Sequence, residues 1–397
     1  MAPIRCIVFF LLVTAFFCMS HNRYAHGQEL NHYQYNIDDG LPSNYTKAVT
    51  KDAHGYIWIG TDYGLSRFNG YRFQNFHESL PSPVIKYLTT YDDSLFVVTD
   101  NGIAVINTRP YSVSIDTFLA GNETLTDSTV FQPKRLFKDS EKRYWVSEPM
   151  SIVRYRDGNM KRYPFDPKFH SLSFTRSFQI LEQASGRILA ISQNGGLFFY
   201  DEENERFQII ERAMGPDFYT VNTVYQEPGT GNIWLGGAEG LFYCRLEGEK
   251  AYLQKYSDYE MIEDLKPQSN RWVLAGTQGN GIFRFRNGNM GFEYEVYSNA
   301  SIDKLDIERL YVDSANSQVW IGSQQGITLV EEKRFRALSF PQSYQYTHSL
   351  DAGSDGSLLT ASNRSVFEIV PLKNEQYRLE KLYEYDGEGL VISTEKV

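Results

Sequence analysis

A short pattern recurs eight times along the chain and limits the folds available to it. Most copies have a hydrophobic anchor, a small residue three positions later and Gly or Ser six positions later; the anchors are Trp58, Phe96, Trp145, Leu189, Trp234, Leu274, Trp320 and Leu359. Successive anchors lie between 38 residues (Trp58 to Phe96) and 49 residues (Phe96 to Trp145) apart. This period lies between those of WD and kelch repeats and exceeds those of most helical or leucine-rich arrays.

The first copy indicates what one repeat builds. Residues 48–50 alternate as a short strand, residues 51–55 form a turn, and residues 56–61 are rich in aromatic and β-branched side chains. Gly64 and then Asn69-Gly70 turn the chain twice more. Four short antiparallel strands make one propeller blade, which buries both faces only between neighbouring blades. The sequence therefore predicts an all-β fold, a β-propeller of four-stranded antiparallel blades, with seven blades favoured over eight.

The anchor side chains are predicted to be scaffold. A large apolar residue in the second strand of each blade would face the next blade and fill the wedge between the two sheets. We expect this role for Trp58, Trp145, Trp234 and Trp320. The alternative for these four residues is stacking on a sugar or a nucleotide.

Residues 1–27 have the layout of a secretory signal peptide. Arg5 lies near the start, an apolar run covers residues 6–19, and a polar stretch ends at Gly27. The apolar run is too short for a comfortable transmembrane helix. We therefore expect a periplasmic protein whose residues 28–387 form the propeller from eight repeats. Residues 388–397 would be the start of a truncated further repeat or a tail.

Charge and cysteine content argue against a nucleic-acid-binding protein and against a disulfide-stabilised protein. The formal net charge is −10, and removal of Arg5 and Arg23 with the leader would make it −12. Because the chain also lacks basic runs, nucleic acid is not an expected partner. Loss of Cys6 and Cys18 would leave Cys244 alone, so no internal disulfide is expected.

The segment before the first complete repeat carries a family resemblance. Residues 33–36 alternate as a strand, and in propellers such a strand often completes the last blade and closes the ring. Residues 39–44, 58–61 and 64–70 together resemble the opening of the two-component regulator propeller family. The resemblance implies a periplasmic sensor region of a hybrid two-component histidine kinase from Bacteroidetes-type bacteria. Many such regions detect oligosaccharides released from glycans.

The resemblance also defines what this chain would lack. Family members are similar in carrying two seven-bladed propellers, a small β-sandwich, a membrane helix, a kinase and regulator domains. The chain has no sequence for the later parts, so the resemblance implies a truncated or split sensor without kinase activity. The remaining sensor and kinase portion, or another periplasmic protein, is an expected partner. An unclosed ring would expose strand edges, so a homodimer is also expected.

Ligand contacts are expected where the loops after the second strands and the connections between blades converge on the axis. Amides, aromatic rings and a few cations in these loops suit sugar hydroxyls or an acidic sugar. The candidate ligand-binding residues are Tyr45, Asp62, Tyr63, Lys134, Arg176, Asn194, Tyr219, Asn222, Glu239, Asn280, Gln324 and Tyr346. For each of them the alternative is an ordinary solvated turn residue.

Catalytic patterns are weak in this sequence. The histidines His32, His54, His77, His170 and His348 fall in different repeats, and no His-Glu-x-x-His motif is present. Cys244 lies in a strand pattern that favours a packed thiol over a nucleophile. We therefore predict no cofactor, no metal and a non-catalytic propeller that senses an oligosaccharide. A protein-interaction scaffold, or a propeller glycoside hydrolase or lyase, is the alternative.

Overall fold

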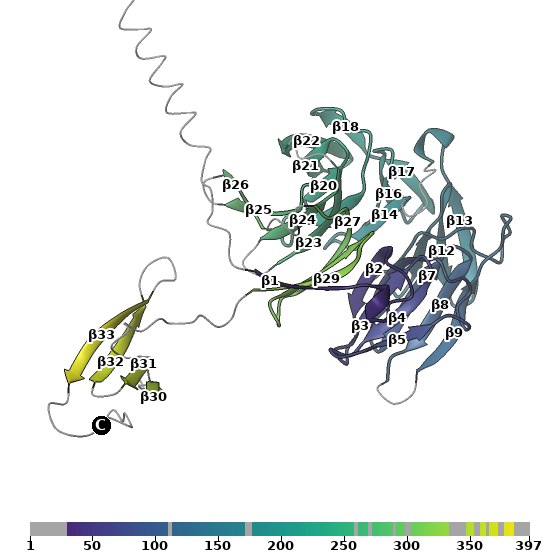
Figure 1. Cartoon of the computed structure of the whole chain (residues 1–397). Coiled ribbons are helices and arrows are strands. Elements are labelled where there is room, and N and C mark those ends of the chain that lie inside the picture. The colour runs from purple at the N-terminus through teal and green to yellow at the C-terminus, as the bar shows by residue number, and fades with distance from the viewer. Residues whose placement is uncertain are drawn as a thin grey trace, which may run out of the picture. The chain divides into compact units, whose positions relative to one another are not determined.

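The computed structural model describes residues 30–109, 113–170, 177–257, 261–268, 272–288, 291–297, 302, 304–332, 347–352, 358–362, 365–371 and 377–384. The chain divides into two compact units, residues 1–332 and 333–397, and each is described by itself. The described residues form β-strands and two short 3-10 helices, η1 (Ile37–Asp39) and η2 (Pro167–Phe169) (Figure 1). The predicted signal peptide and the predicted tail at residues 388–397 lie outside the described residues.

The first three blades of unit 1 are four-stranded and follow the chain order. Blade 1 consists of β2 (Thr46–Lys51), β3 (Ile57–Thr61), β4 (Gly64–Phe68) and β5 (Phe73–Phe76). Blade 2 consists of β6 (Ile85–Tyr91), β7 (Ser94–Thr99), β8 (Gly102–Asn107) and β9 (Ser114–Ala120). Blade 3 consists of β10 (Arg135–Lys138), β11 (Tyr144–Ser147), β12 (Ser151–Arg156) and β13 (Asn159–Pro164).

The next three blades continue in the same way, and blade 5 gains a fifth strand, β18 (Glu211–Met214), paired in parallel with its edge. Blade 4 consists of β14 (Phe178–Glu182), β15 (Ile188–Ser192), β16 (Leu197–Asp201) and β17 (Arg206–Ile209). Blade 5 consists of β19 (Thr223–Gln226), β20 (Ile233–Gly237), β21 (Gly240–Glu247) and β22 (Lys250–Ser257). Blade 6 consists of β23 (Ile262–Pro267), β24 (Val273–Thr277), β25 (Ile282–Gly288) and β26 (Gly291–Val296).

Blade 7 joins the two ends of unit 1. It consists of β27 (Ile307–Asp313), β28 (Gln318–Ser323), β29 (Gly326–Glu332) and, as its outermost strand, β1 (Leu30–Tyr35). The antiparallel register runs from Leu30 opposite Glu332 to Tyr35 opposite Ile327. Figure 1 shows β1, in purple, beside β29, in green. The prediction that a strand before the first repeat completes the last blade is therefore confirmed.

The innermost strands of unit 1 form a closed ring. Contacts run from β2 through β6, β10, β14, β19 and β23 to β27, and β27 returns to β2. This ring is compatible with the seven blades favoured from the sequence. An eighth sheet lies in unit 2 and consists of β30 (Thr347–Ala352), β31 (Leu358–Ser362), β32 (Ser365–Pro371) and β33 (Tyr377–Glu384). The predicted all-β fold of four-stranded antiparallel sheets is confirmed.

The anchor tryptophans fill the wedges between blades, as predicted. Trp58 is fully buried and packs with Ile85 and Leu88 of blade 2. In the same way Trp145, Trp234 and Trp320 lie in clusters that include residues of blades 4, 6 and 1, respectively. Burial of a large aromatic side chain is among the strongest apolar contributions that one residue can make to folding. Each anchor therefore joins its blade to the next one.

Glycines two residues after an anchor let neighbouring blades approach closely. A Cβ added at Gly60 would lie 2.4 Å from Ile85 Cγ2, and one added at Gly236 would lie 2.5 Å from Ile262 Cγ2. Both isoleucines begin the innermost strand of the following blade. A small residue two positions after the anchor is therefore a packing requirement in blades 1 and 5, and it is distinct from the small residue three positions after the anchor in the sequence pattern.

Candidate functional site

In four blades the innermost strand has a β-bulge one residue after its start. A bulge opposes two residues to one on the partner strand and redirects a side chain. Blades 3 and 5 have a residue at the equivalent position. In both blades the residue that follows it pairs with the residue two positions after the anchor, as in the four blades with a bulge. We call these six residues, in blade order 1, 2, 3, 5, 6 and 7, the bulge layer: Lys47, Lys86, Lys134, Asn222, Glu263 and Glu308.

The bulge layer is basic in blades 1 to 3. Lys86 and Lys134 are only 2% and 3% exposed. Burial, together with repulsion from Lys86, lowers the pKa of Lys134 to about 8, and nearby Asp100 opposes this change. Burial and repulsion from Lys47 likewise lower the pKa of Lys86. Three lysines therefore lie close enough to weaken one another's charged form.

The opposite side of the bulge layer is amide and acidic. Asn222 Nδ2 donates to Glu263 Oε1 at 3.3 Å and to the carbonyl of Ile262 at 3.1 Å. Tyr45 Oη donates to Glu308 Oε1 at 3.2 Å. Lys47 Nζ lies 4.6 Å from the centre of the Tyr45 ring. Tyr45 therefore connects the acidic and basic sides where blade 7 meets blade 1.

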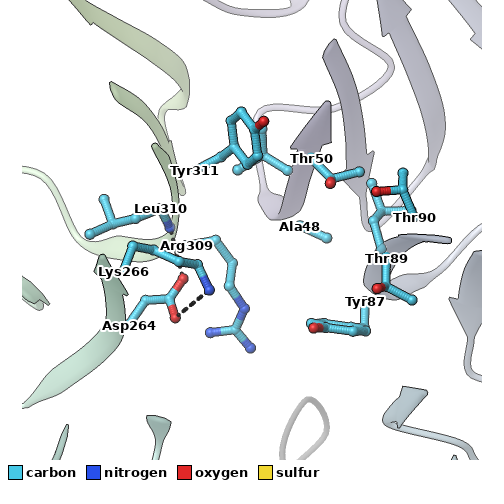
Figure 2. Close-up of a pocket in the computed structure, with 12 residues that line it drawn as sticks. Ala48, Thr50, Tyr87, Thr89, Thr90, Asp264, Lys266, Arg309, Leu310 and Tyr311 are labelled. Atoms are coloured by element: carbon cyan, nitrogen blue, oxygen red, sulfur yellow. Dashed lines mark hydrogen bonds and ion pairs between the residues drawn. The ribbon is translucent and has the colours of Figure 1, made fainter. Parts of the chain in front are cut away.

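A cavity of about 170 Å³ lies one step further along the innermost strands. It is lined by residues of β2, β6, β23 and β27, among them Thr50, Tyr87, Asp264 and Arg309. Figure 2 shows these side chains converging from the two sides of the cavity, with the Arg309 guanidinium between Asp264 and Tyr87. The bulge layer and this cavity together give the axis of the ring a charged, hydrogen-bonding interior.

A second cavity, of about 380 Å³, lies at the other end of β2, between blades 7 and 1. Its lining includes Trp320 and Asp313. In blades 1 and 3 an aspartate six residues before the anchor accepts the indole N–H, with Trp58 Nε1 2.7 Å from Asp52 Oδ2. Asp313 precedes Trp320 by seven residues and binds Lys51 at 2.5 Å instead. Trp320 Nε1 is buried and has no acceptor among the described residues.

The structure brings three of the candidate residues from the sequence close to the axis. Lys134 and Asn222 belong to the bulge layer, and Tyr45 binds Glu308 of that layer. Tyr63 and Tyr219 lie on loops and are 64% and 67% exposed. The centre of the Tyr63 ring lies 5.9 Å from that of His77, and Tyr219 Oη donates to Asp217 Oδ2 at 3.4 Å.

The remaining candidates divide into three groups. Asn280 and Gln324 are exposed, and Asp62 is half-buried. Asn194 Nδ2 donates to the carbonyl of His170 at 2.6 Å, and Glu239 accepts from the Thr220 N–H at 3.2 Å, so both stabilise loops. The other two candidates, Arg176 and Tyr346, lie outside the described residues.

Several charged residues on the axis were not among the candidates from the sequence, chiefly Lys86, Glu263, Arg135 and Arg309. Each lies at the start of an innermost strand, where an apolar residue would be expected on a packed face. A signal was available, because a charged residue follows the first apolar residue of the strand in blocks 2, 6 and 7. It was missed because neither bulges nor the register of the ring can be inferred from the spacing of the anchors.

The described residues contain neither a metal-binding cluster nor a membrane-spanning helix. Among the described residues, no group of three or more His, Cys, Asp or Glu side chains is placed to hold a metal ion. In the same part of the chain, no helix is long and apolar enough to cross a membrane. Cys244 is buried, and burial raises the pKa of its thiol to about 12.

Solved structures of other proteins share this fold at low sequence identity. The extracellular domain of the putative hybrid two component system BT3049 from B. thetaiotaomicron is 18% identical, with a TM-score of 0.60 over 89% of this chain and 49% of that one. The corresponding domain of BT4673 from B. thetaiotaomicron is 20% identical, with a TM-score of 0.58 over 91% and 48%. A catalytically inactive virginiamycin B lyase from Staphylococcus aureus is 13% identical, with a TM-score of 0.56 over 76% and 99%.

The present chain therefore spans about half the length of the two extracellular domains. No curated protein matches its sequence. Residues 40–63 match the family model described as "Two component regulator propeller". This repeat and the propeller fold confirm the predicted resemblance to the two component regulator propeller family.

Proposed function

We propose that this propeller is the ligand-binding part of an extracytoplasmic sensor and that it binds an oligosaccharide without turning it over. The repeat at residues 40–63 and the fold shared with two extracellular domains of hybrid two component systems support a sensor. A signal peptide at residues 1–27 would bring the chain to the periplasm. The signalling partner would be the remaining sensor and kinase portion, or another periplasmic protein.

The face that carries the bulge layer is the proposed site. The observation that carries this assignment is the pair of buried lysines, Lys86 and Lys134. Burying an ammonium group opposes folding, so lysines at the axis are easier to explain by binding than by packing. Tyr63 and Tyr219 would provide exposed rings on the same face for stacking against sugar faces.

The charge of the bulge layer favours an oligosaccharide that carries an acidic group. Lys47, Lys86 and Lys134 would receive a carboxylate or sulfate, while Asn222 and Glu308 would bind hydroxyl groups on the opposite side. A neutral oligosaccharide would bring no negative charge to add to that of Asp100, which already opposes the repulsion among the lysines. We therefore expect uronic-acid-containing or sulfated fragments to bind more tightly than neutral fragments of the same length.

Calorimetric titration of the full chain with matched acidic and neutral oligosaccharides tests this proposal. We expect one ligand per chain and no new products by chromatography after long incubation. Lys86→Met should weaken binding of the acidic fragments at least tenfold, and Lys250→Met, which removes an exposed lysine on β22, should leave it unchanged.

Two results would contradict the proposal. Release of products would favour the lyase or hydrolase alternative, for which the fold shared with virginiamycin B lyase is the relevant comparison. Absence of binding across acidic and neutral fragments, from a chain that unfolds cooperatively, would favour the interaction scaffold.

A further inference from the structure

Two arginines from different blades lie at the same register of the ring. Arg135 of β10 pairs with Ser147, and Arg309 of β27 pairs with Gly322, in each case two residues after the anchor of the second strand. Arg309 is 5% exposed and lines the cavity on the axis. Burial and the charge of Arg309 lower the pKa of Arg135. The two guanidinium groups therefore repel each other.

Both guanidinium groups keep unused hydrogen-bond donors. Arg309 Nη1 donates to the carbonyl of Glu308 at 2.7 Å, but Arg309 Nε is buried and has no acceptor among the described residues. The Arg135 guanidinium lies 4.9 Å from the centre of the Tyr87 ring, and Tyr87 lines the cavity. Arg135 Nε and Nη2 are likewise buried and without an acceptor in the described part of the chain. Buried donors of this kind are rare in folded proteins and call for an explanation.

The neighbouring carboxylate is already committed to other donors. Asp264 is 2% exposed and accepts from the Leu310 N–H at 2.9 Å, from Lys266 Nζ at 3.2 Å and from Thr223 Oγ1 at 3.3 Å. Figure 2 shows Lys266 reaching Asp264, with the Arg309 guanidinium between Asp264 and Tyr87. Asp264 binds Lys266, and its charge also attracts Arg309 and Arg135, so one carboxylate faces three cationic side chains.

We propose that this cavity binds one small oxyanion, which accepts hydrogen bonds from the unused donors of Arg309 and Arg135. Guanidinium groups suit tetrahedral and carboxylate oxyanions because several N–H groups lie in one plane. A volume of about 170 Å³ exceeds several-fold the roughly 10–15 Å³ that a cavity needs to hold one water molecule. The cavity thus has room for a sulfate, a phosphate or a single carboxylate.

The ligand could be free in solution or attached to a sugar, and the chemistry of recognition is the same. Equilibrium dialysis of the full chain against labelled sulfate, phosphate, glucuronate and galactose 6-sulfate, at constant ionic strength set by sodium chloride, separates these sources. We expect one oxyanion per chain and a melting temperature that rises to saturation with its concentration. Binding of an inorganic ion identifies a free oxyanion, whereas binding of the sugar acids alone identifies a substituent of a glycan.

Variants locate the site. Arg309→Gln should lower the affinity for the oxyanion at least tenfold, and Arg72→Gln, which removes an exposed arginine of blade 1 with the same change of charge, should not. Arg135→Gln relieves the repulsion, so in buffer without oxyanions it should melt above the wild type. This second readout remains informative if Arg309→Gln does not fold.

Two results would overturn the proposal. One is the absence of saturable binding of all four probes by the wild-type chain, and the other is binding that Arg309→Gln leaves intact. The proposal does not rest on the sensing function, because the dialysis probes are small ions and monosaccharides. A chain that binds oligosaccharides but no oxyanion would retain the sensing function and lose this site.

Discussion

Replacement of Lys134 by methionine should stabilise the protein at neutral pH. Lys134 is 3% exposed, and burial is the largest cause that lowers its pKa from 10.5 to about 8. At 1.36 kcal/mol for each pH unit, this difference means that the ammonium group destabilises the folded state by about 3 kcal/mol. Methionine has a similar shape and no charge, so Lys134→Met should regain up to about 3 kcal/mol of unfolding free energy at pH 7.

The pH dependence fixes the sign of this effect. Because the pKa in the folded state lies below that in the unfolded state, the penalty is fully present below pH 8 and disappears as the pH rises toward 10.5. Urea unfolding of wild type and variant at pH 7 and pH 10 measures it directly. The advantage of the variant should shrink at pH 10, and the subtraction removes contributions from other groups that titrate in this range.

Lys250→Met serves as the control, because the Lys250 side chain is exposed on β22. It should change the unfolding free energy by less than about 0.5 kcal/mol at either pH. Two results would contradict this prediction. One is a lower unfolding free energy of Lys134→Met than of the wild type at pH 7, and the other is a gain in unfolding free energy that is equal at pH 7 and pH 10. In either case the contacts of the ammonium group would outweigh the effect of its burial.

Three further predictions concern the scaffold. Trp58→Phe should lower the unfolding free energy by about 1–2 kcal/mol more than Trp320→Phe in urea titrations, because the Trp58 indole donates to buried Asp52 whereas the Trp320 indole has no acceptor in the described structure. Arg162→Met should cost about 3–5 kcal/mol by the same measurement, because fully buried Glu148 accepts from Arg162 Nε at 2.9 Å; a second change, Glu148→Gln, should recover part of that loss. Cys244 should react with a thiol reagent only as fast as the chain unfolds, because burial raises the pKa of its thiol to about 12; rapid labelling of the native protein, followed by absorbance, would contradict this.

The scaffold could be predicted because the same pattern recurs in most blades. The anchor of the second strand packs against the next blade, and the small residue three positions later hydrogen-bonds the turn into the third strand at Thr61 and Thr99. The closing strand β1 was predictable from its alternating aromatics, and Tyr35 now packs on Phe68 and Trp320. These features can be predicted from the sequence of one blade once an adjacent blade is assumed.

The charged axis could not be predicted in the same way. Whether Lys86 faces the axis depends on a bulge that shifts the register of β6 by one residue, and a shift of one residue exchanges the two faces of a strand. Arg135 and Arg309 lie 174 positions apart in the sequence (309 − 135). They repel each other only because the ring brings their blades together. The hydrophobic pattern within one repeat predicts neither the bulge in β6 nor the repulsion between the two arginines.

Comparison of the blades with one another separates scaffold from site. The hydroxyl three residues after the anchor donates to a carbonyl of the following turn at Thr61, Thr99 and Thr277, at 2.8–2.9 Å in each case. This hydrogen bond recurs because the chain turns back between the second and third strands of each of these blades.

The bulge layer behaves in the opposite way. Its backbone geometry recurs in four blades, yet its side chains change from Lys in blades 1 to 3 to Asn or Glu in blades 5 to 7. Folding constrains all these positions alike, so it cannot account for a change of sign across the ring. Buried charge also opposes folding, as the lowered pKa of Lys134 indicates. The asymmetry of the axis is therefore the feature of this propeller that supports the proposed ligand site.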